Sequence, residues 1–193
     1  MTELKENVMP VERPVCSSGF TLLEALVVLV LLGTIMALAA PSLTELRQKH
    51  QMQGQGEHLL NSLMLARSEA LRRQQRVTLC LRADNDGCAS EGSWAQGWVV
   101  FVDANDNAKR EVQEVVLQVH ESLPPFLRLK GNSTVNRYVS YGPEGRSQTV
   151  SGAFQAGTLT LCRPDQLSGW RVVINAVGKP RLETTVLATS TDC

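Results

Sequence analysis

The chain has 193 residues, and its 19 lysines and arginines balance its 19 aspartates and glutamates. With 43% hydrophobic and 20% charged residues, the composition argues against a disordered chain and against a membrane protein with many spans. The zero net charge argues against a uniformly basic nucleic-acid binder, and the length fits one domain with an appendage.

The most hydrophobic segment lies close to the N-terminus, at residues 20–41. Residues 25–40 carry no charge, and residues 20–40 as a helix would span about 31 Å, the thickness of a bilayer core. A secretory signal peptide is the alternative, but it would begin with basic residues and end at a small-residue cleavage site. Here 19 residues of mixed charge come first, and Pro41 follows the alanines. We therefore expect residues 20–41 to form a transmembrane helix.

Glu24 is unusual because a carboxylate within a membrane-length apolar run is costly and points to a function. The alternative is that Glu24 lies at the level of the lipid head groups. The segment from Gly19 to Glu24, GFTLLE, resembles the processing site of type IV prepilins and pseudopilins. The resemblance implies that prepilin peptidase cleaves between Gly19 and Phe20 and methylates the new N-terminal Phe20. Glu24 would then pair with the free amino group of a neighbouring subunit and set the register of a fibre.

The leader that this cleavage would remove, residues 1–19, differs from the short and basic leaders of the family. It contains three acids and two bases, and Met9 is an alternative start. The family resemblance implies that the processed chain is held in the bacterial inner membrane by one helix, with a periplasmic head. It would then join other major and minor pilins in a fibre at the cell surface.

Residues 42–76 continue the helical pattern as an amphipathic arm. An apolar stripe for packing on a sheet recurs there at helical spacing, formed by Leu59, Leu63, Ala66 and Ala70. Gly54 and Gly56 each lower helix stability by about 1 kcal/mol relative to alanine. We therefore expect a kink or local melting at these two glycines.

From residue 77 the pattern changes to short β-prone runs with turn residues between them. The runs are residues 77–81, 98–102, 112–120, 126–130, 138–141, 158–161, 170–174 and 181–188. Such spacing predicts an antiparallel sheet or a small sandwich packed on the helix stripe. We therefore expect an α+β fold with a β-rich globular head at residues 77–193.

The chain has five cysteines, of which Cys16 lies in the predicted leader. The other four allow three disulfide connectivities. We favour Cys80–Cys88, which closes a short loop around an Asp-Gly turn, and Cys162–Cys193, which ties the last residue to a strand. An exported head is in an oxidising compartment, which favours disulfides. Zinc is the alternative, but the chain has no CxxC motif and no histidine at ligand spacing from a cysteine.

A polar segment after residue 102 raises the question of calcium. Asp103, Asn105, Asn107 and Glu114 occupy positions 1, 3, 5 and 12 of an EF-hand-like pattern. Position 6 of that motif requires glycine and is Ala108 here, and the flanking runs are strand-like. A polar hairpin turn accounts for the same residues, so we assign no metal and no cofactor. The sequence contains no nucleophile, P-loop or dinucleotide motif, and we predict no enzymatic activity.

The C-terminal part of the chain is basic although the whole chain is neutral. Eight bases face two acids between residues 126 and 182, a net charge of +6, which can attract an anionic polymer. The alternative is that these are solvated charges that deter pairing of strand edges. The candidate DNA-binding residues are Arg146, Arg163, Arg171, Lys179 and Arg181.

A series of motifs along residues 19–182 resembles the GspH/FimT group of minor pilins and pseudopilins. The motifs are, in chain order, ARSEA, VTLC, GWVVFVD, YGPEGR, GTLTLC and VVINAVGKPR. The resemblance implies a minor, initiating or tip-proximal fibre subunit, FimU-like or FimT-like, with a pseudopilin of type II secretion as an alternative. DNA-binding members carry a Gly-Arg-x-Arg motif, for which this chain has GKPR at residues 178–181. Lysine keeps the positive charge but lacks the bidentate fork of arginine, so DNA uptake stays a second hypothesis.

Overall fold

The structure is a computed structural model that describes residues 19–175, 177–189 and 193. The predicted leader, with Met9 and Cys16, therefore lies outside the described residues except for Gly19. The chain divides into two compact units between residues 45 and 46, and one long helix contributes to both.

This helix, α1, extends over 52 residues from Leu22 to Arg73. Thr21 caps its first turn, because the side-chain Oγ1 accepts a hydrogen bond from the backbone N–H of Glu24 at 3.2 Å. Glu24 itself lies in the first turn, where the helix dipole favours a negative charge. The helix therefore begins just after the predicted cleavage site.

The N-terminal part of α1, residues 22–38, exposes every side chain. The apolar residues from Leu26 to Leu32 each have between 46 and 68% of their surface exposed. Among the described helices, none taken alone is long and apolar enough to cross a membrane, but Leu22–Leu38 and Ser42–Arg73 meet the same criteria as a bent pair. The described residues of the chain leave this apolar surface uncovered.

Helix α1 runs without a break through Gly54 and Gly56, so the predicted local melting is wrong. The reason is tertiary packing. Gly56 is buried, and a Cβ at this position would lie 3.1 Å from the side chain of Leu182 and 3.8 Å from that of Leu161. The absence of a side chain lets the helix approach these leucines, and the contact compensates for the low helix propensity of glycine.

The first sheet has four antiparallel strands in the order β3-β2-β1-β5. They are β1 (Val77–Leu81), β2 (Trp98–Val102), β3 (Val116–His120) and β5 (Tyr138–Tyr141). A short 3-10 helix, η1 (Trp94–Gln96), precedes β2. Strand β3 is shorter than the predicted run at 112–120, because residues 112–114 form a turn closed by a hydrogen bond from the Glu114 N–H to the Glu111 carbonyl.

The second sheet is also antiparallel, in the order β4-β6-β7-β8. Its strands are β4 (Arg128–Gly131), β6 (Gly157–Cys162), β7 (Ser168–Ile174) and β8 (Pro180–Val186). A 3-10 helix, η2 (Ser133–Val135), lies between β4 and β5 and so connects the two sheets. The predicted α+β class, a long helix with antiparallel sheets, is confirmed.

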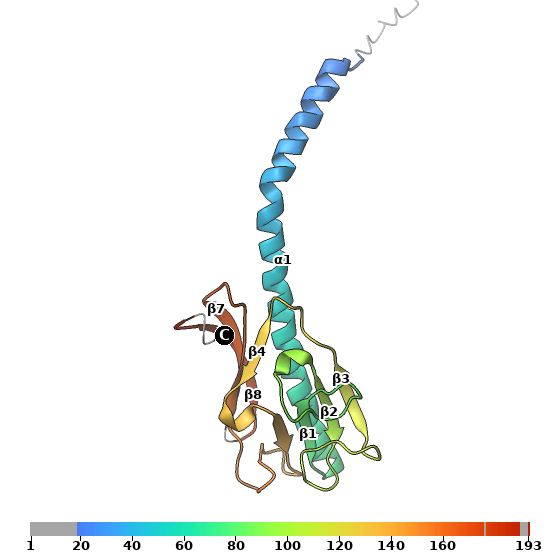
Figure 1. Ribbon diagram of the computed structural model, residues 1–193, viewed down its shortest axis with the longest axis vertical. Helices are drawn as coiled ribbons and strands as arrows, with labels where there is room; N and C mark the ends of the chain where they lie inside the picture. The colour runs from blue at the N-terminus through green and yellow to red at the C-terminus, as the bar shows by residue number, and fades with distance from the viewer. Residues whose placement is uncertain (1–18, 176, 190–192) are drawn as a thin grey trace, which may run out of the picture. The chain divides into compact units, whose positions relative to one another are not determined.

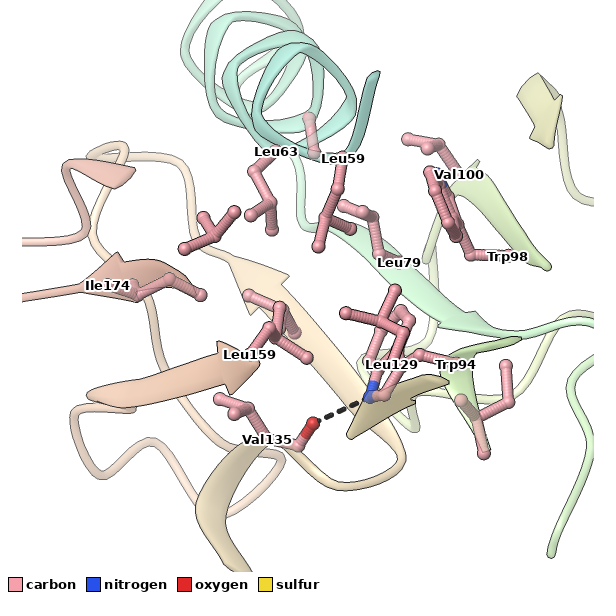
Figure 2. Packing of buried hydrophobic residues seen from close by; sticks show 14 of the residues in the cluster. Leu59, Leu63, Leu79, Trp94, Trp98, Val100, Leu129, Val135, Leu159 and Ile174 are labelled. Carbon is pink, nitrogen blue, oxygen red and sulfur yellow. Dashed lines mark hydrogen bonds between the residues drawn. The ribbon is translucent and has the colours of Figure 1, made fainter. Parts of the chain in front are cut away.

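The core of the head lies where the C-terminal half of α1 packs on both sheets (Figure 1). The predicted apolar stripe of the helix is buried, with at most 1% of each side chain exposed. Figure 2 shows Leu59 and Leu63 facing apolar residues of both sheets, which include Leu79, Trp98, Val100, Leu129, Leu159 and Ile174. One helix face thus holds the two sheets together, since burying each large apolar side chain contributes about 1.5–3 kcal/mol.

Two buried tryptophans add polar links to this core. The indole Nε1 of Trp98 donates to Ser62 Oγ of α1 at 3.0 Å. The indole Nε1 of Trp94 donates to the Val135 carbonyl at 2.9 Å and so joins η1 to η2 (Figure 2). Because a buried N–H without a partner is costly, these bonds fix how the tryptophans are placed between the elements.

Candidate functional site

The predicted cleavage site is exposed and precedes the helix. Gly19 and Phe20 lie outside α1, and Phe20 has 83% of its surface exposed. A Cβ built on Gly19 would have no atom within 4 Å. Glu24, one turn further on, is exposed and makes no ion pair with any residue that the structure describes. The peptide bond is thus open to a peptidase, and the carboxylate is open to a partner.

Both disulfides of the favoured pairing are present in the head. Cys80 and Cys88 have their Cα atoms 5.5 Å apart, and Cys162 and Cys193 have theirs 5.7 Å apart. The first disulfide closes the loop after β1, and the second joins Cys193 to the end of β6. Since all four thiols are used in this way, they offer no ligand set to zinc.

The polar segment at residues 103–114 is a loop organised by two buried carboxylates. Asp103, 1% exposed, accepts hydrogen bonds from the N–H groups of Asn107 at 3.0 Å and Ala108 at 2.9 Å. Glu114 accepts from the N–H groups of Ala104 and Glu111, both at 2.9 Å. Burial raises the pKa of Glu114.

These contacts agree with the polar-turn interpretation of the segment. The first and last acids of the EF-hand-like pattern, Asp103 and Glu114, direct their oxygens to N–H groups of the loop. Within the described part of the chain, no group of three or more histidine, cysteine, aspartate or glutamate side chains is arranged to hold a metal. Glu111, which the sequence analysis did not single out, accepts from the Asn107 side chain at 2.7 Å, and this bond lowers its pKa.

Three of the five candidate DNA-binding residues are paired with acids. Arg163, with 11% of its side chain exposed, forms a two-bond ion pair with Asp165. Arg171 and Arg181 share Glu183, at 3.2 and 3.3 Å. The net charge counted over residues 126–182 therefore overstates the free positive charge, because Glu183 lies one residue beyond that range.

The other two candidates, Arg146 and Lys179, are exposed on two turns that touch. A Cβ at Gly178, where φ is +77°, would lie 2.6 Å from the backbone nitrogen of Ser147 and 3.0 Å from the carbonyl oxygen of Gly145. Only glycine allows this approach of the two backbones. The motifs YGPEGR and GKPR, which are far apart in the sequence, thus form one surface.

Arg67 of helix α1 belongs to the same surface, although the sequence analysis passed over it as part of the ARSEA motif. Its Nε donates to the Gly145 carbonyl at 2.8 Å, across 78 residues of sequence. Glu144, on the same turn, is the nearby acid and is exposed. We call Arg67, Arg146 and Lys179 the basic turn surface.

Comparison with known proteins places the chain in a family. The model of the type II transport protein GspH family matches residues 55–178, which is more than half of the chain. The chain belongs to the GspH family. A second family model, the prokaryotic N-terminal methylation motif, matches residues 16–40. A search of curated proteins gave no significant match.

Solved structures were also compared with the chain. Two crystal forms of the type IV minor pilin FimU of Pseudomonas aeruginosa PAO1 give TM-scores of 0.54 and 0.53 at 20% identity. They cover 72 and 75% of this chain and 98 and 92% of FimU. The minor pseudopilin EpsH from the type 2 secretion system of Vibrio cholerae gives a TM-score of 0.48 at 12% identity, covering 70% of this chain and 97% of EpsH. The FimU likeness shows a shared fold.

The resemblance to minor pilins and pseudopilins drawn from the sequence is therefore confirmed. Pilins are structural proteins, and the segment that the N-terminal methylation motif matches contains Phe20. Membership of this family implies processing by prepilin peptidase, assembly with other pilins, and a course from the membrane to a fibre.

Proposed function

We propose that this GspH-family chain is a minor type IV pilin. It either primes the assembly of a pilus fibre or is incorporated into the fibre near its tip. The observation that carries the proposal is the N-terminal segment itself. An exposed Gly19–Phe20 bond precedes helix α1. The first part of this helix, residues 22–38, is exposed and apolar apart from one charged residue, Glu24. Residues 20–41 would anchor the chain in the inner membrane before assembly.

The free-energy cost of exposing the apolar segment 22–38 to water favours assembly. The apolar side chains of residues 22–38 become buried when they pack on the helices of neighbouring subunits, which favours association by about 25 cal/mol per Å². Such packing is head-to-tail and does not close, so it extends into a fibre. Cleavage frees the amino group of Phe20, and its ion pair with Glu24 of the adjacent subunit neutralises a carboxylate that would otherwise stay unpaired in an apolar setting.

The test expresses the full chain in pilus-forming bacteria and measures both processing and recovery in sheared fibres. We expect Gly19→Val to block the shift in mass that cleavage causes. Glu24→Ala should be cleaved normally but be depleted at least tenfold from fibres, whereas the matched change Glu45→Ala should leave recovery unchanged. Normal recovery of Glu24→Ala would refute the register role.

A pseudopilin of type II secretion is an alternative with the same mechanism, and the name of the matching family favours it. The two roles differ in the fibre that the chain enters. Expression in a strain with a pilus system alone and in one with a secretion system alone separates them, because the chain should be recovered with the subunits of one fibre and not the other.

A second candidate function is capture of DNA, which the basic turn surface favours. Arg146 and Lys179 are exposed and unpaired among the described residues, and the contact of their turns brings them to one surface with Arg67. Cations spaced in this way bind phosphates without reading sequence, and their binding weakens steeply with salt.

Gel-shift titration of the full chain in detergent against duplex DNA tests this function. We expect Arg146→Ala with Lys179→Ala to weaken binding at least tenfold at low salt. A control with the same charge, Arg128→Ala with Lys130→Ala on β4, should weaken it less. Equal affinity at low and high salt, or equal effects of the two double variants, would overturn DNA binding by this surface.

A further inference from the structure

A cavity of about 670 Å³ lies in the head on the face of the first sheet that points away from α1. Alternate residues of β1 face opposite sides: Leu79 packs in the core with α1, whereas Cys80 packs on the other side with Val99 and Phe101. The cavity is bordered by the Cys80–Cys88 disulfide, the segment 107–111, Arg137 just before β5 and Tyr138 at its start. None of the functions proposed above uses it.

The charged residues that line this cavity are mainly positive. The lining has three cations, Lys109, Arg110 and Arg137, and one acid, Glu111. None of the three cations forms an ion pair with a residue that the structure describes. The rest of the lining is mixed: Ser90 and Asn107 are polar, and the disulfide, two alanines and Tyr138 form the more apolar part. The lining therefore suits an anionic group carried on a partly apolar ligand.

Two atoms of these lining residues are buried and lack a hydrogen-bond partner among the described residues. They are Nε of Arg110, a charged donor, and Oε2 of Glu111, an acceptor. Leaving a buried charged group unpaired costs more than leaving a neutral one unpaired. One ligand that offers both an acceptor and a donor would satisfy the pair, and an isolated carboxylate ion, which has no donor, would not.

The wall that bears these atoms is held in place before any ligand arrives. The backbone N–H of Arg110 donates a hydrogen bond to Cys88 Sγ at 3.3 Å, which joins segment 107–111 to the disulfide loop. Buried Asp103 accepts from the N–H of Ala108 and holds this residue at a φ of +56°. A pre-organised wall lowers the entropy cost of binding.

We propose that this cavity binds an aspartate or glutamate residue presented by a peptide chain. Its carboxylate would accept from Arg110 and Arg137, and a backbone N–H would donate to Glu111 Oε2. The source of the residue is an exposed acidic loop of an adjacent pilin subunit, an assignment that rests on the proposed fibre assembly. The net positive lining selects an acidic loop over a basic or neutral one.

Binding is tested on the full ¹⁵N-labelled chain in detergent with acetyl-Gly-Asp-Gly-amide as the probe. We expect its affinity to exceed that of acetyl-Gly-Asn-Gly-amide, and of acetate, at least tenfold. Arg110→Gln and Arg137→Gln should each weaken binding at least fivefold, whereas Lys130→Gln, which removes the same charge on β4, should leave it within twofold. Absence of binding, equal affinity for the aspartate and asparagine probes, or equal loss with Lys130→Gln would overturn the site.

Fibre recovery then tests the source of the residue. Recovery of Arg110→Gln with Arg137→Gln in sheared fibres should fall at least threefold, with processing at Gly19 intact. Probe binding together with unchanged recovery would overturn an adjacent subunit as the partner. If the unmodified chain itself fails to enter fibres, the proposed function fails while the peptide titration still decides whether the cavity binds an acidic residue.

Discussion

The two parts of helix α1 place their leucines in opposite surroundings. Leu59 and Leu63, within the head, are at most 1% exposed and pack on strands of their own chain, whereas Leu29 is 68% exposed. The difference teaches that the head is stabilised within the subunit, whereas the described residues leave the N-terminal part of the helix uncovered, and the proposed function assigns its cover to a membrane or to other subunits. Substitutions in the two parts should therefore affect different measurements.

Shortening one side chain in each part of the helix gives the sharpest test of this contrast. Leu63→Ala should lower the free energy of unfolding of the head by about 4 kcal/mol, because it leaves a cavity in a packed core. Leu29→Ala should change it by less than about 0.5 kcal/mol, as is usual for an exposed site. Chemical denaturation in detergent, followed by near-UV circular dichroism, measures both values. A similar loss from the two changes would contradict the contrast.

The two disulfides should differ because they close loops of different length. Their partners are separated by 31 residues for Cys162–Cys193 and by 8 for Cys80–Cys88. The loop-entropy relation gives a loss of about 3.7 kcal/mol for the first and about 2.5 kcal/mol for the second when each is replaced by two serines. The reverse order in denaturant titrations would show that strain or residual structure, rather than loop closure, governs their contributions.

A smaller effect is expected from pH at the contact between α1 and β3. The His120 ring stacks on Trp98 at 3.9 Å and lies 5.5 Å from the ring of His58 on α1. Burial, and secondly the proximity of His58, lowers the pKa of His120, although the Glu121 carbonyl opposes the shift. The unfolded chain then binds a proton more readily than the head does.

The sign of the pH effect follows from that difference. The stability that neutral His120 contributes is complete above its unfolded pKa, about 6.5, and is lost as pH falls through the lower folded value. The melting temperature of the head should therefore drop more steeply below pH 6.5 in the parent chain than in His120→Gln. Melting temperatures are measured by scanning calorimetry. If they fall in parallel with pH for the two proteins, another group controls the loss of stability at low pH.

The smallest expected effect separates two neighbouring glycines of α1. A Cβ at Gly54 meets no atom within 4 Å, so Gly54→Ala should raise stability by about 1 kcal/mol through helix propensity. Gly56→Ala gains the same propensity but presses on Leu182 at 3.1 Å, so its net gain should be smaller. Thermal unfolding of the two variants compares them directly, and an equal gain would show that Leu182 moves aside freely.

Features that depend on neighbours in sequence could be predicted, and features that depend on distant strands could not. The Leu59–Leu63 spacing predicts the buried helix face, and GFTLLE lies in the segment that the methylation-motif model matches, because each signal is local. Arg171 and Glu183 are opposite one another only in the register of β7 and β8, so a charge count that stops at residue 182 misses their ion pair. The contact of Arg67 with Gly145 has no local signal for the same reason.

The sequence also could not identify the cavity beside the first disulfide. Its wall depends on the side of β1 that Cys80 faces and on the folding of segment 107–111 against Cys88. The EF-hand-like spacing pointed to this segment, but the sequence pattern could not distinguish metal ligands from carboxylates that accept hydrogen bonds from backbone N–H groups. Asp103 and Glu114 are of the second kind.

The burial of one helix face against two sheets has a mechanical consequence. When a fibre is pulled, tension along α1 reaches the head as shear across the Leu59–Leu63 interface, where many weak contacts must break together. Resistance to forced unfolding is set by the unfolding rate rather than by equilibrium stability. The helix stripe therefore acts as the point where load passes from the fibre axis into the head, and single-molecule extension should find the head intact until this interface slips.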